Sequence, residues 1–443
     1  MPSQTLSVPY GQSAMEFTLP ASMRATVAAS KPAPPVPDAP AAVEAALRHP
    51  IGTPPLRQLA RPGDRVCIVF TDATRASPDH VLVPAMLGEL ERAGVRPEDI
   101  TLLCGTGMHR PSTPAERIAK LGADVAARYR VLDNRAQDPQ AIVNLGLTSA
   151  GVPVSIHRSV VEADLVLATG IVEPHQYAGY SGGCKTLAVG AAGEALIAHT
   201  HGPAFVDHAG TRLGVIDGNP FQDAITEAAR RAGLRFILNV VLDDARRLLR
   251  VAAGEPMAAF SDLVGFARSV YEVPIPHRYD IAIGGAGYPK DSNLYQATRA
   301  ASYLFFAPTP VVRPGGYIII PARCEEGAGA GVAEERYLRA MRDAPDIAFI
   351  LEDARINGYP PGQQRAFVMA KVLEQARVII VASECPDLVA ACKMIPAPTV
   401  EAALARAAAD LGPGSQVLVV PHALQTLPVV TATGASIASG TSA

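Results

Sequence analysis

Short apolar runs recur along this chain at intervals that leave room for a helix between them, and this alternation limits its fold more than any other feature. Such runs, rich in Val, Ile and Leu, are typical of strands buried on both faces of a parallel sheet. They occupy residues 65–71, 99–104, 164–169, 236–242, 280–285, 316–321, 347–351, 378–382 and 416–420. Amphipathic segments typical of helices lie between them, at 79–94, 219–233, 362–376 and 398–412. Strand alternating with helix predicts an α/β fold.

The length of 443 residues predicts two domains, since a domain holds roughly 100–200 residues. The polar stretch 271–280 contains two prolines and is the best candidate linker. We therefore expect α/β domains over residues 1–275 and 276–443, with mostly parallel, Rossmann-like sheets and the active site in the cleft between them. The Pro-rich segment 31–40 is predicted to be only an extended connector, because too little chain precedes it to form a core.

Composition excludes several classes of partner. A net charge of −3, no Trp and 5% aromatic residues argue against a nucleic-acid-binding face. The six cysteines show neither C-x-x-C nor zinc-finger spacing, which favours free thiols in a reducing compartment. No apolar run reaches the roughly 18 residues of a membrane span, and the N-terminus lacks the pattern of a signal peptide. We expect a cytoplasmic protein without nucleic-acid or membrane partners.

Side chains capable of catalysis follow several predicted strands closely. They are Asp72 and Arg75 after 65–71, His109 after 99–104, His175 after 164–169 and Lys290 after 280–285. Ligands of open α/β sheets bind outside the carboxyl ends of the strands. These residues are therefore predicted to lie at one edge of the sheet, where a site would form.

The segment 179–186 is rich in glycine and ends in Lys185-Thr186. It resembles a phosphate-binding P-loop, but Cys184 stands where the second glycine must be and no strand runs directly into it. ATP binding is therefore disfavoured. The glycines would let the backbone approach a bulky group and form an anion-binding nest, and a desolvated Lys185 would serve as nucleophile or anchor. A plain turn with an exposed lysine is the alternative.

Two further segments carry polar side chains at suggestive spacings. His199 and His201 would suit zinc if a third ligand such as His208 joined them, although a polar helix end explains them equally well. In the second segment, Asp291 or Ser292 is predicted to cap a helix. That helix would bring together Tyr295, Gln296 and Arg299, a set that can orient a carboxylate but would also suit an ordinary polar face.

Taken together, these segments resemble the nickel-dependent lactate racemase family, whose enzymes use a nickel-pincer nucleotide. The similar blocks follow the family's order and spacing from residue 65 to about 376. They are Asp72-Ala73-Thr74-Arg75, Gly105 to His109, Glu173-Pro174-His175, Gly179 to Lys185, His201, and Tyr288 to Gln296.

The resemblance implies an isomerase that racemises or epimerises a 2-hydroxy acid by transient hydride transfer to its cofactor. That cofactor is nickel held by a pyridinium-3,5-bisthiocarboxylate mononucleotide, attached covalently to Lys185, with His201 as the protein's nickel ligand. The implied partners are the small 2-hydroxy acid and the enzymes that synthesise the cofactor. His199 receives no role.

The resemblance also implies roles for the remaining matched residues. His109 and His175 are the catalytic acid/base pair, one for each hand of the substrate. The nucleotide is held by Asp72, Ala73, Thr74 and Arg75. The substrate is contacted by Arg75, Tyr295, Gln296 and Arg299.

Two departures from the family's lactate enzymes affect the substrate pocket. Arg299 stands where those enzymes have Lys, and the stretch 357–365 lacks their Trp. An arginine can grip a second carboxylate with two parallel bonds. We therefore expect a substrate larger or more acidic than lactate, with malate as one candidate and aliphatic, aromatic and sugar acids still open.

Rival functions come from other classes. A nicotinamide-dependent dehydrogenase is disfavoured because no strand is followed by G-x-G-x-x-G with an acidic residue about 20 positions on. A zinc-dependent hydrolase would use His199 and His201. A non-catalytic nucleotide-binding homologue would not need the complete set of His109, His175, Lys185 and His201.

Overall fold

The computed structural model describes residues 4–431, which form two compact units, each with its own sheet. The β4 unit, named after a central strand, comprises Pro32–Thr211 and Val215–Val270. The β15 unit comprises the residues up to Lys31, Arg212–Gly214 and the chain from Tyr271 onward. No helix within residues 4–431 is long and apolar enough to cross a membrane.

The β4 unit is built on a six-stranded sheet in the order β13-β12-β9-β4-β5-β6. Its strands are β4 (Val66–Thr71), β5 (Ile100–Gly105), β6 (Arg130–Asp133), β9 (Leu165–Ile171), β12 (Leu234–Leu242) and β13 (Leu248–Gly254). All neighbours are parallel except β12 and β13. Every residue of β4 and β9 is buried, as their unbroken apolar sequences predict.

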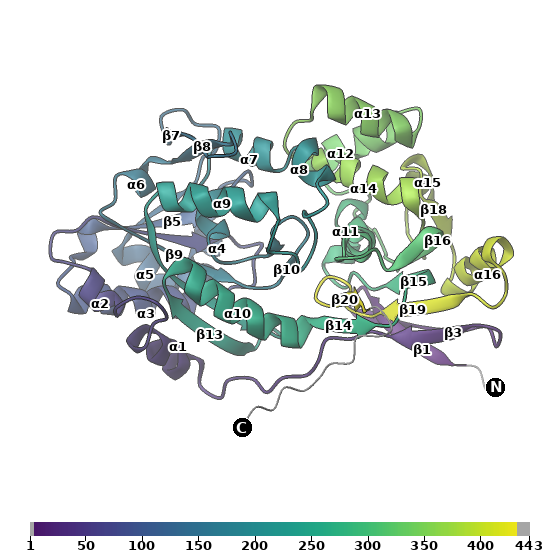
Figure 1. The fold of residues 1–443 in the computed structure, drawn as a ribbon, viewed down its shortest axis with the longest axis horizontal. Helices are drawn as coiled ribbons and strands as arrows, with labels where there is room; N and C mark the ends of the chain where they lie inside the picture. The colour runs from purple at the N-terminus through teal and green to yellow at the C-terminus, as the bar shows by residue number, and fades with distance from the viewer. Residues whose placement is uncertain (1–3, 432–443) are drawn as a thin grey trace. The chain divides into compact units, whose positions relative to one another are not determined.

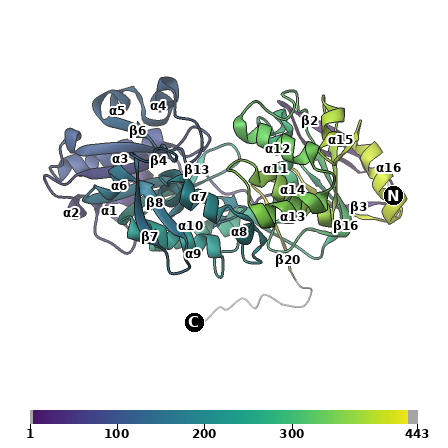
Figure 2. The same ribbon diagram turned by 90° about the horizontal axis from the view of Figure 1, so that it is seen from above.

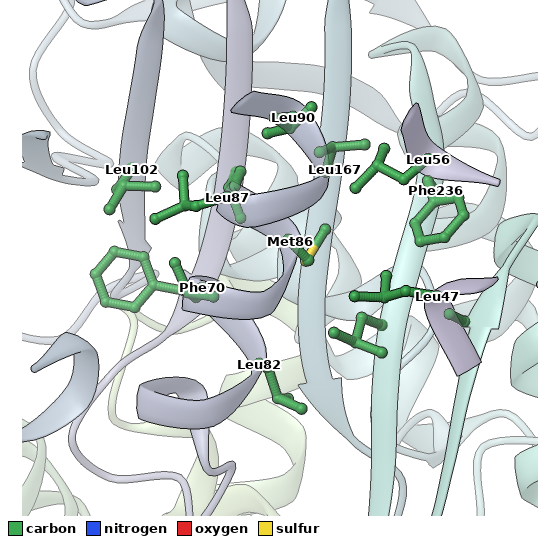
Figure 3. Packing of buried hydrophobic residues seen from close by; sticks show 14 of the residues in the cluster. Leu47, Leu56, Phe70, Leu82, Met86, Leu87, Leu90, Leu102, Leu167 and Phe236 are labelled. Carbon is green, nitrogen blue, oxygen red and sulfur yellow. The ribbon is translucent and has the colours of Figure 1, made fainter. Parts of the chain in front are cut away.

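Helices α1 (Ala39–Arg48), α2 (Leu56–Leu59) and α3 (Asp79–Arg92) pack on this sheet (Figure 1). Leu47, Leu56, Met86 and Leu90 of these helices meet Phe70, Leu102, Leu167 and Phe236 of the strands in one apolar cluster (Figure 3). Burial of this cluster is the main stabilisation that the unit gains on folding.

Other elements of the β4 unit shape the loops at the strand ends. The helices are α4 (Pro114–Leu121), α5 (Ala123–Arg128), α6 (Arg158–Val161), α7 (Glu194–Thr200), α8 (Pro203–Asp207), α9 (Pro220–Arg231) and α10 (Pro256–Tyr271). Short helical turns occur at Pro97–Asp99 and, as a π-helix, at Thr186–Gly190. The hairpins are β7 (Ile142–Leu147) with β8 (Pro153–His157) and β10 (Pro174–His175) with β11 (Gly179–Tyr180).

The β15 unit has a six-stranded, fully parallel sheet in the order β18-β17-β16-β15-β19-β3. Its strands are β3 (Arg24–Val27), β15 (Tyr279–Gly284), β16 (Val312–Pro321), β17 (Arg377–Val381), β18 (Ile395–Ala397) and β19 (Gln416–Val420). Helices α11 (Leu294–Phe305), α12 (Val332–Asp343), α13 (Ile347–Asn357) and α14 (Gln364–Gln375) lie together (Figures 1 and 2). Helices α15 (Pro386–Ala391) and α16 (Val400–Leu411) and the short helix Lys290–Ser292 complete it.

The predicted domain division is wrong for the N-terminal residues, which it placed in the domain 1–275. They belong to the β15 unit, where β3 pairs with β19 at the edge of the sheet. The hairpin of β1 (Thr5–Tyr10) and β2 (Ser13–Thr18) buries Val8 and Phe17 in that unit's core. The segment 31–40, predicted to be only a connector, is thus where the chain passes from one unit to the other. An open sheet edge can accept a strand from any part of the chain, so local sequence does not reveal this pairing.

The predicted linker 271–280 is not an unstructured connector. Residues Glu272–Ile275 form β14, which pairs in parallel with β20 (Leu427–Val430). The chain nevertheless changes units at Tyr271, close to the predicted boundary at residue 275.

The apolar run 347–351, predicted to be a strand, is the first part of helix α13. The Asp346 side chain accepts a hydrogen bond from the Phe349 N–H and caps that helix. Ile350, Leu351 and Ala354 are buried along it. A five-residue apolar run is short enough to suit either a strand or one buried face of a helix, and the cap decides between them.

Candidate active site

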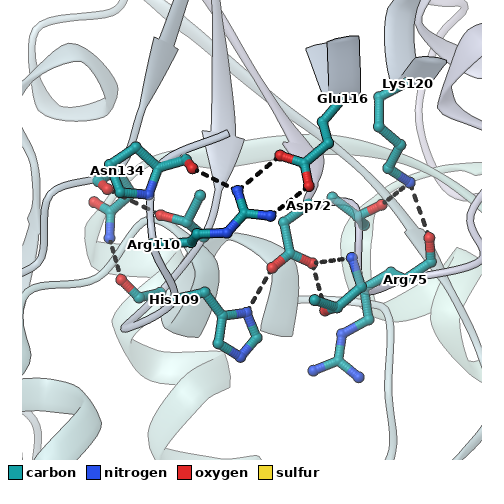
Figure 4. Close-up of polar contacts among 12 residues, drawn as sticks. Asp72, Arg75, His109, Arg110, Glu116, Lys120 and Asn134 are labelled. Carbon is teal, nitrogen blue, oxygen red and sulfur yellow. Dashed lines mark hydrogen bonds and ion pairs between the residues drawn. The ribbon is translucent and has the colours of Figure 1, made fainter. Parts of the chain in front are cut away.

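Asp72 and His109 come from neighbouring strand ends and are hydrogen-bonded. Asp72 directly follows β4, and His109 lies in the turn after β5. His109 Nδ1 is 2.5 Å from Asp72 Oδ2, and Thr74 donates to the other carboxylate oxygen from its N–H (3.2 Å) and its hydroxyl (2.7 Å) (Figure 4). The Asp72 side chain is 9% exposed and that of His109 is 51% exposed. A buried carboxylate therefore holds a histidine whose ring reaches solvent.

The charge of Asp72 follows from these contacts. Burial raises the pKa of Asp72. The hydrogen bond and charge of His109, with smaller contributions from Thr74 and Arg75, outweigh this effect and lower the pKa to about 2. An ionised carboxylate accepts the Nδ1–H of His109, which leaves Nε2 as the proton acceptor of the neutral ring. Both oxygens of the Asp72 carboxylate thus accept bonds from the protein itself, from His109 and Thr74. The role predicted for Asp72 in holding a nucleotide stays a prediction.

Arg75 lies in the turn that follows Asp72. Its N–H donates to the carbonyl oxygen of Asp72 (3.2 Å), and its own carbonyl accepts a bond from Lys120 (3.1 Å). The backbone of Arg75 is thus fixed at both polar groups. Figure 4 shows its guanidinium extending in the same general direction as the ring of His109.

A buried ion pair between Lys120 and Asp79 contacts this turn. Lys120 Nζ of α4 is 2.9 Å from Asp79 Oδ2, at the start of α3. Sequence patterns do not single out either residue, because an acidic residue in a first helical turn and a lysine near a helix end are ordinary features. Only their burial in the folded chain marks them as unusual.

His175 and His201 are joined through two aromatic rings. The ring of Tyr177 lies 5.9 Å from that of His175 and 5.2 Å from that of His201, centroid to centroid. Phe221 of α9 lies 6.4 Å and 5.0 Å from the same two rings. Sequence patterns did not point to Tyr177 or Phe221. The only available signal was the position of Tyr177 two residues after His175.

The rings of His109 and His175 differ in how their Nδ1 atoms are bonded. His175 Nδ1 accepts hydrogen bonds from the N–H groups of Tyr177 (3.3 Å) and Ala178 (3.2 Å). A neutral ring in that setting carries its proton on Nε2. His175 therefore presents Nε2 as a donor, whereas His109 presents Nε2 as an acceptor.

The surroundings of His201 favour its neutral form. It lies directly after α7, and its Nδ1 is 3.0 Å from the carbonyl oxygen of Ile197. Burial, together with the positive charge of Lys185, lowers the pKa of His201 to about 4, against the opposing effect of the backbone bond. Nδ1 donates to that carbonyl, and Nε2 is the nitrogen with the lone pair, which is the arrangement that metal-binding histidines use.

The glycines before Lys185 serve the packing of the protein's own chain. Gly179, Gly182 and Gly183 all have positive φ angles, at 74°, 81° and 55°. A Cβ atom would lie 2.1 Å from the Val215 carbonyl oxygen at Gly179 and 2.9 Å from the Phe260 ring at Gly183. No larger residue fits at either position.

The anion-binding nest expected from these glycines is wrong for Gly183, because its N–H donates to Asn239 Oδ1 at 2.7 Å. The loop instead delivers Lys185, whose N–H bonds to the Gly182 carbonyl, to the start of the π-helix Thr186–Gly190. Cys184 is buried, and burial raises the pKa of its thiol to about 12, so it is not a nucleophile.

The zinc site considered for His199 and His201 does not form. His199 is exposed and packs edge-on against Phe205, while His208 Nδ1 accepts a bond from the Gly210 N–H. Within residues 4–431 no three His, Cys, Asp or Glu side chains are grouped so that they could hold a metal ion.

In the β15 unit, α11 carries the predicted substrate-contacting residues. Asn293, rather than Asp291 or Ser292, caps this helix by accepting a bond from the Gln296 N–H (3.0 Å). Asp291 and Ser292 instead form part of the short helix before it, with Lys290. The prediction of Asp291 or Ser292 as the cap is therefore wrong, because both lie in the short helix and α11 begins one residue after Asn293.

Gln296 and Arg299 form one polar group on α11, since Arg299 Nε donates to Gln296 Oε1 at 2.7 Å. This bond leaves the Nη1–Nη2 edge of the guanidinium as the one that would face an anion. Tyr295 is buried between the ring of Tyr337 (5.6 Å) and the guanidinium of Arg365 (5.7 Å). Tyr295 thus packs inside the unit, and its predicted contact with the substrate stays a prediction.

Comparison with known proteins places this chain in a family. The model of the lactate racemase N-terminal domain matches residues 10–214, and that of the lactate racemase C-terminal domain matches residues 276–427. A lactate racemase of Lactiplantibacillus plantarum is 33% identical over 389 residues, which cover 86% of this chain and 89% of that protein. The chain belongs to the lactate racemase family. The resemblance read from the motifs is thereby confirmed.

Other members of the lactate racemase family agree. The lactate racemase of Thermoanaerobacterium thermosaccharolyticum is 29% identical over 428 residues, covering 95% of this chain and 98% of that one. The structure of the lactate racemase apoprotein from that organism matches with a TM-score of 0.86 and 28% identity, covering 96% of this chain and 100% of the other. The two-domain α/β fold is confirmed by this match. A Thermotoga maritima crystal structure at 18% identity and a TM-score of 0.63 shares the fold alone.

Proposed function

We propose that this protein is a nickel-dependent racemase or epimerase of a 2-hydroxy acid, and hence an isomerase. The relatives above are named lactate racemase. The observation that carries the proposal is the difference between the two histidines, with Nε2 an acceptor in His109 and a donor in His175. Interconversion of mirror-image hydroxy acids needs a proton acceptor and a proton donor.

The residues present fit the family's cofactor. When bound, the nickel-pincer nucleotide would supply a hydride acceptor and donor that no side chain provides. Lys185 would hold it covalently, and Nε2 of the neutral His201 would bind the nickel. The positive charge of Lys185 helps to lower the pKa of His201, which supports a site that uses both side chains. A metal with a single protein ligand does not need the three-residue cluster that is missing from residues 4–431.

The proton chemistry falls to the chain's own residues. His109 would take the hydroxyl proton at Nε2, and the ionised Asp72 would stabilise the imidazolium that forms. His175 would donate a hydrogen bond from its Nε2–H to the substrate oxygen. For the opposite enantiomer the two histidines exchange these tasks, so both are needed in each direction.

The substrate carboxylate would be oriented by the Gln296–Arg299 pair. Because the Arg299 guanidinium presents two parallel donors where a lysine presents a compact charge, we propose a preferred acid larger or more acidic than lactate. Malate is the first candidate.

One experiment tests the class of enzyme. The protein is produced together with the cofactor-synthesis enzymes and examined by intact mass, peptide mapping and nickel analysis. We expect a nucleotide adduct on Lys185 with nickel, and racemisation of a single-enantiomer 2-hydroxy acid seen by chiral chromatography. Zinc without nickel and without an adduct would contradict the proposal.

His201→Ala is expected to lose nickel while the nucleotide stays attached through Lys185. The physical reason is that the variant removes the neutral imidazole on which the charge of Lys185 acts. Nickel per adduct is the measurement, and His199→Ala is the matched control because its ring packs on Phe205 instead. Unchanged nickel in His201→Ala would exclude His201 as the ligand.

Arg299→Lys is expected to change specificity. Loss of a charge-assisted, two-bond contact costs about 1.5–3 kcal/mol, so kcat/KM on the preferred acid should fall roughly 10- to 150-fold and much less on lactate. A panel of single-enantiomer acids on parent and variant measures this. If lactate proves to be the best substrate of the parent, the specificity argument fails.

A further inference from the structure

A buried ion pair lies at the carboxyl end of β4, and no motif of the sequence pointed to it. Lys120 Nζ is 2.9 Å from Asp79 Oδ2, and the two side chains are 11% and 0% exposed. Replacing a buried ion pair by apolar residues of the same volume is often neutral or stabilising, because desolvation of the two charges offsets their attraction. Stability is therefore a weak explanation for this pair.

Lys120 binds the turn that follows β4 at several points. Its ammonium donates to the Thr71 hydroxyl (2.8 Å), to the Arg75 carbonyl (3.1 Å) and to the Ser77 carbonyl (2.9 Å). Figure 4 shows the bond to Arg75. An ammonium with its donors directed at two backbone carbonyls of one turn restricts the turn's position.

Asp79 ties the same turn to the sheet. Its carboxylate accepts bonds from the hydroxyls of Thr71 in β4 (2.5 Å), Ser77 in the turn (3.1 Å) and Thr169 in β9 (2.5 Å). Strands β4 and β9 are neighbours in the sheet. The ion pair thus joins two strands, α4 and the turn 72–77 in one network.

That turn carries Asp72, the partner of His109. The Asp72 carboxylate is held by Thr74, and the Asp72 carbonyl accepts the Arg75 N–H, so its position depends on the whole turn. We infer that the Lys120–Asp79 pair is a positioning device that holds the turn 72–77 so that Asp72 meets Nδ1 of His109. Only the effect on catalysis rests on the proposed function.

The opposite ends of the same two strands offer a matched comparison. Arg65, just before β4, pairs with Asp164, just before β9, at 3.0 Å. Their side chains are 62% and 46% exposed, and they bind one another rather than a functional turn. An exposed pair of this kind contributes little.

The test compares two neutral double variants in the full chain, Lys120→Met with Asp79→Asn, and Arg65→Met with Asp164→Asn. Both replace the charges by groups of similar size, so neither leaves a buried unpaired charge. The measurements are thermal unfolding, amide hydrogen exchange over 72–77, and the ¹⁵N spectrum of the His109 ring in protein without cofactor. The His109 signal is assigned from a His109→Gln sample.

We expect the Lys120/Asp79 variant to stay folded, to exchange the amides of 72–77 at least about tenfold faster, and to lose the Nδ1–H signature of His109. In cofactor-loaded protein, kcat should fall about 10- to 100-fold with KM nearly unchanged, as expected when a catalytic group is misplaced. The Arg65/Asp164 variant should match the parent in thermal unfolding, amide exchange, the His109 spectrum and kinetics.

Unchanged exchange in 72–77 and an unchanged His109 spectrum would overturn the inference, as would equal effects in both variants. If the Lys120/Asp79 variant does not fold, Thr169→Val removes one hydroxyl from Asp79 and is judged by the same exchange and spectra. Protein that never racemises any acid would refute the proposed function, while the exchange and the spectra still decide this inference.

Discussion

Replacing Lys185 with alanine should abolish racemisation and the covalent adduct while the protein stays folded. The loop around Lys185 is fixed by the packing of Gly179 and Gly183 and by the bond from the Gly183 N–H to Asn239, which the substitution leaves in place. Under the proposed function the lysine amine forms the thioamide, so its removal would take away the hydride acceptor. Intact mass, thermal unfolding and chiral chromatography measure the three parts of this result.

Lys185→Arg is the matched control for charge. It keeps a cation beside His201 but offers no amine for a thioamide, so it should also lack the adduct and the activity. A variant of either kind that keeps both the adduct and full activity would show that the tether lies elsewhere.

His109→Ala and His175→Ala should each suppress racemisation in both directions. General acid–base assistance contributes typically 10²–10⁴-fold, and the proposed path between the two enantiomers uses both rings, so each loss should fall in that range. Initial rates starting from each pure enantiomer, on protein with equal adduct and nickel content, give the measurement.

His199→Ala provides the reference for these two variants, because His199 lies in the same unit but is exposed against Phe205. Its rates should stay close to those of the parent. If either catalytic variant still racemises within a few-fold of the parent, that histidine has no part in the mechanism.

Much of the fold was predictable because its strands are buried on both faces. The predicted runs at 65–71, 99–104 and 164–169 became β4, β5 and β9, and 416–420 became β19 without a shift. Burial on both faces requires an unbroken apolar sequence, which is visible without any knowledge of partners. The run 347–351 misled because a helix with one buried face can contain the same short pattern.

The candidate site was predictable only as a set of residues. Asp72, His109 and His175 stand directly after strands, and parallel strands bring such positions to one edge. The bond between Asp72 and His109 was not predictable, since it joins residues from separate strand ends through side-chain geometry. The roles of these residues in catalysis stay predictions that the variants above test.

The sequence by itself determined the α/β fold class and the family, because periodic burial and ordered motifs are local properties of the chain. Three matters were decided only by the tertiary structure. Strand β3 completes the sheet of the β15 unit, and Gly183 binds Asn239 rather than an anion. Lys120 pairs with Asp79 in the interior. Each depends on contacts between residues far apart in the chain. Such contacts are selected by shape and by the need to satisfy buried polar groups, and neither leaves a local pattern in the sequence.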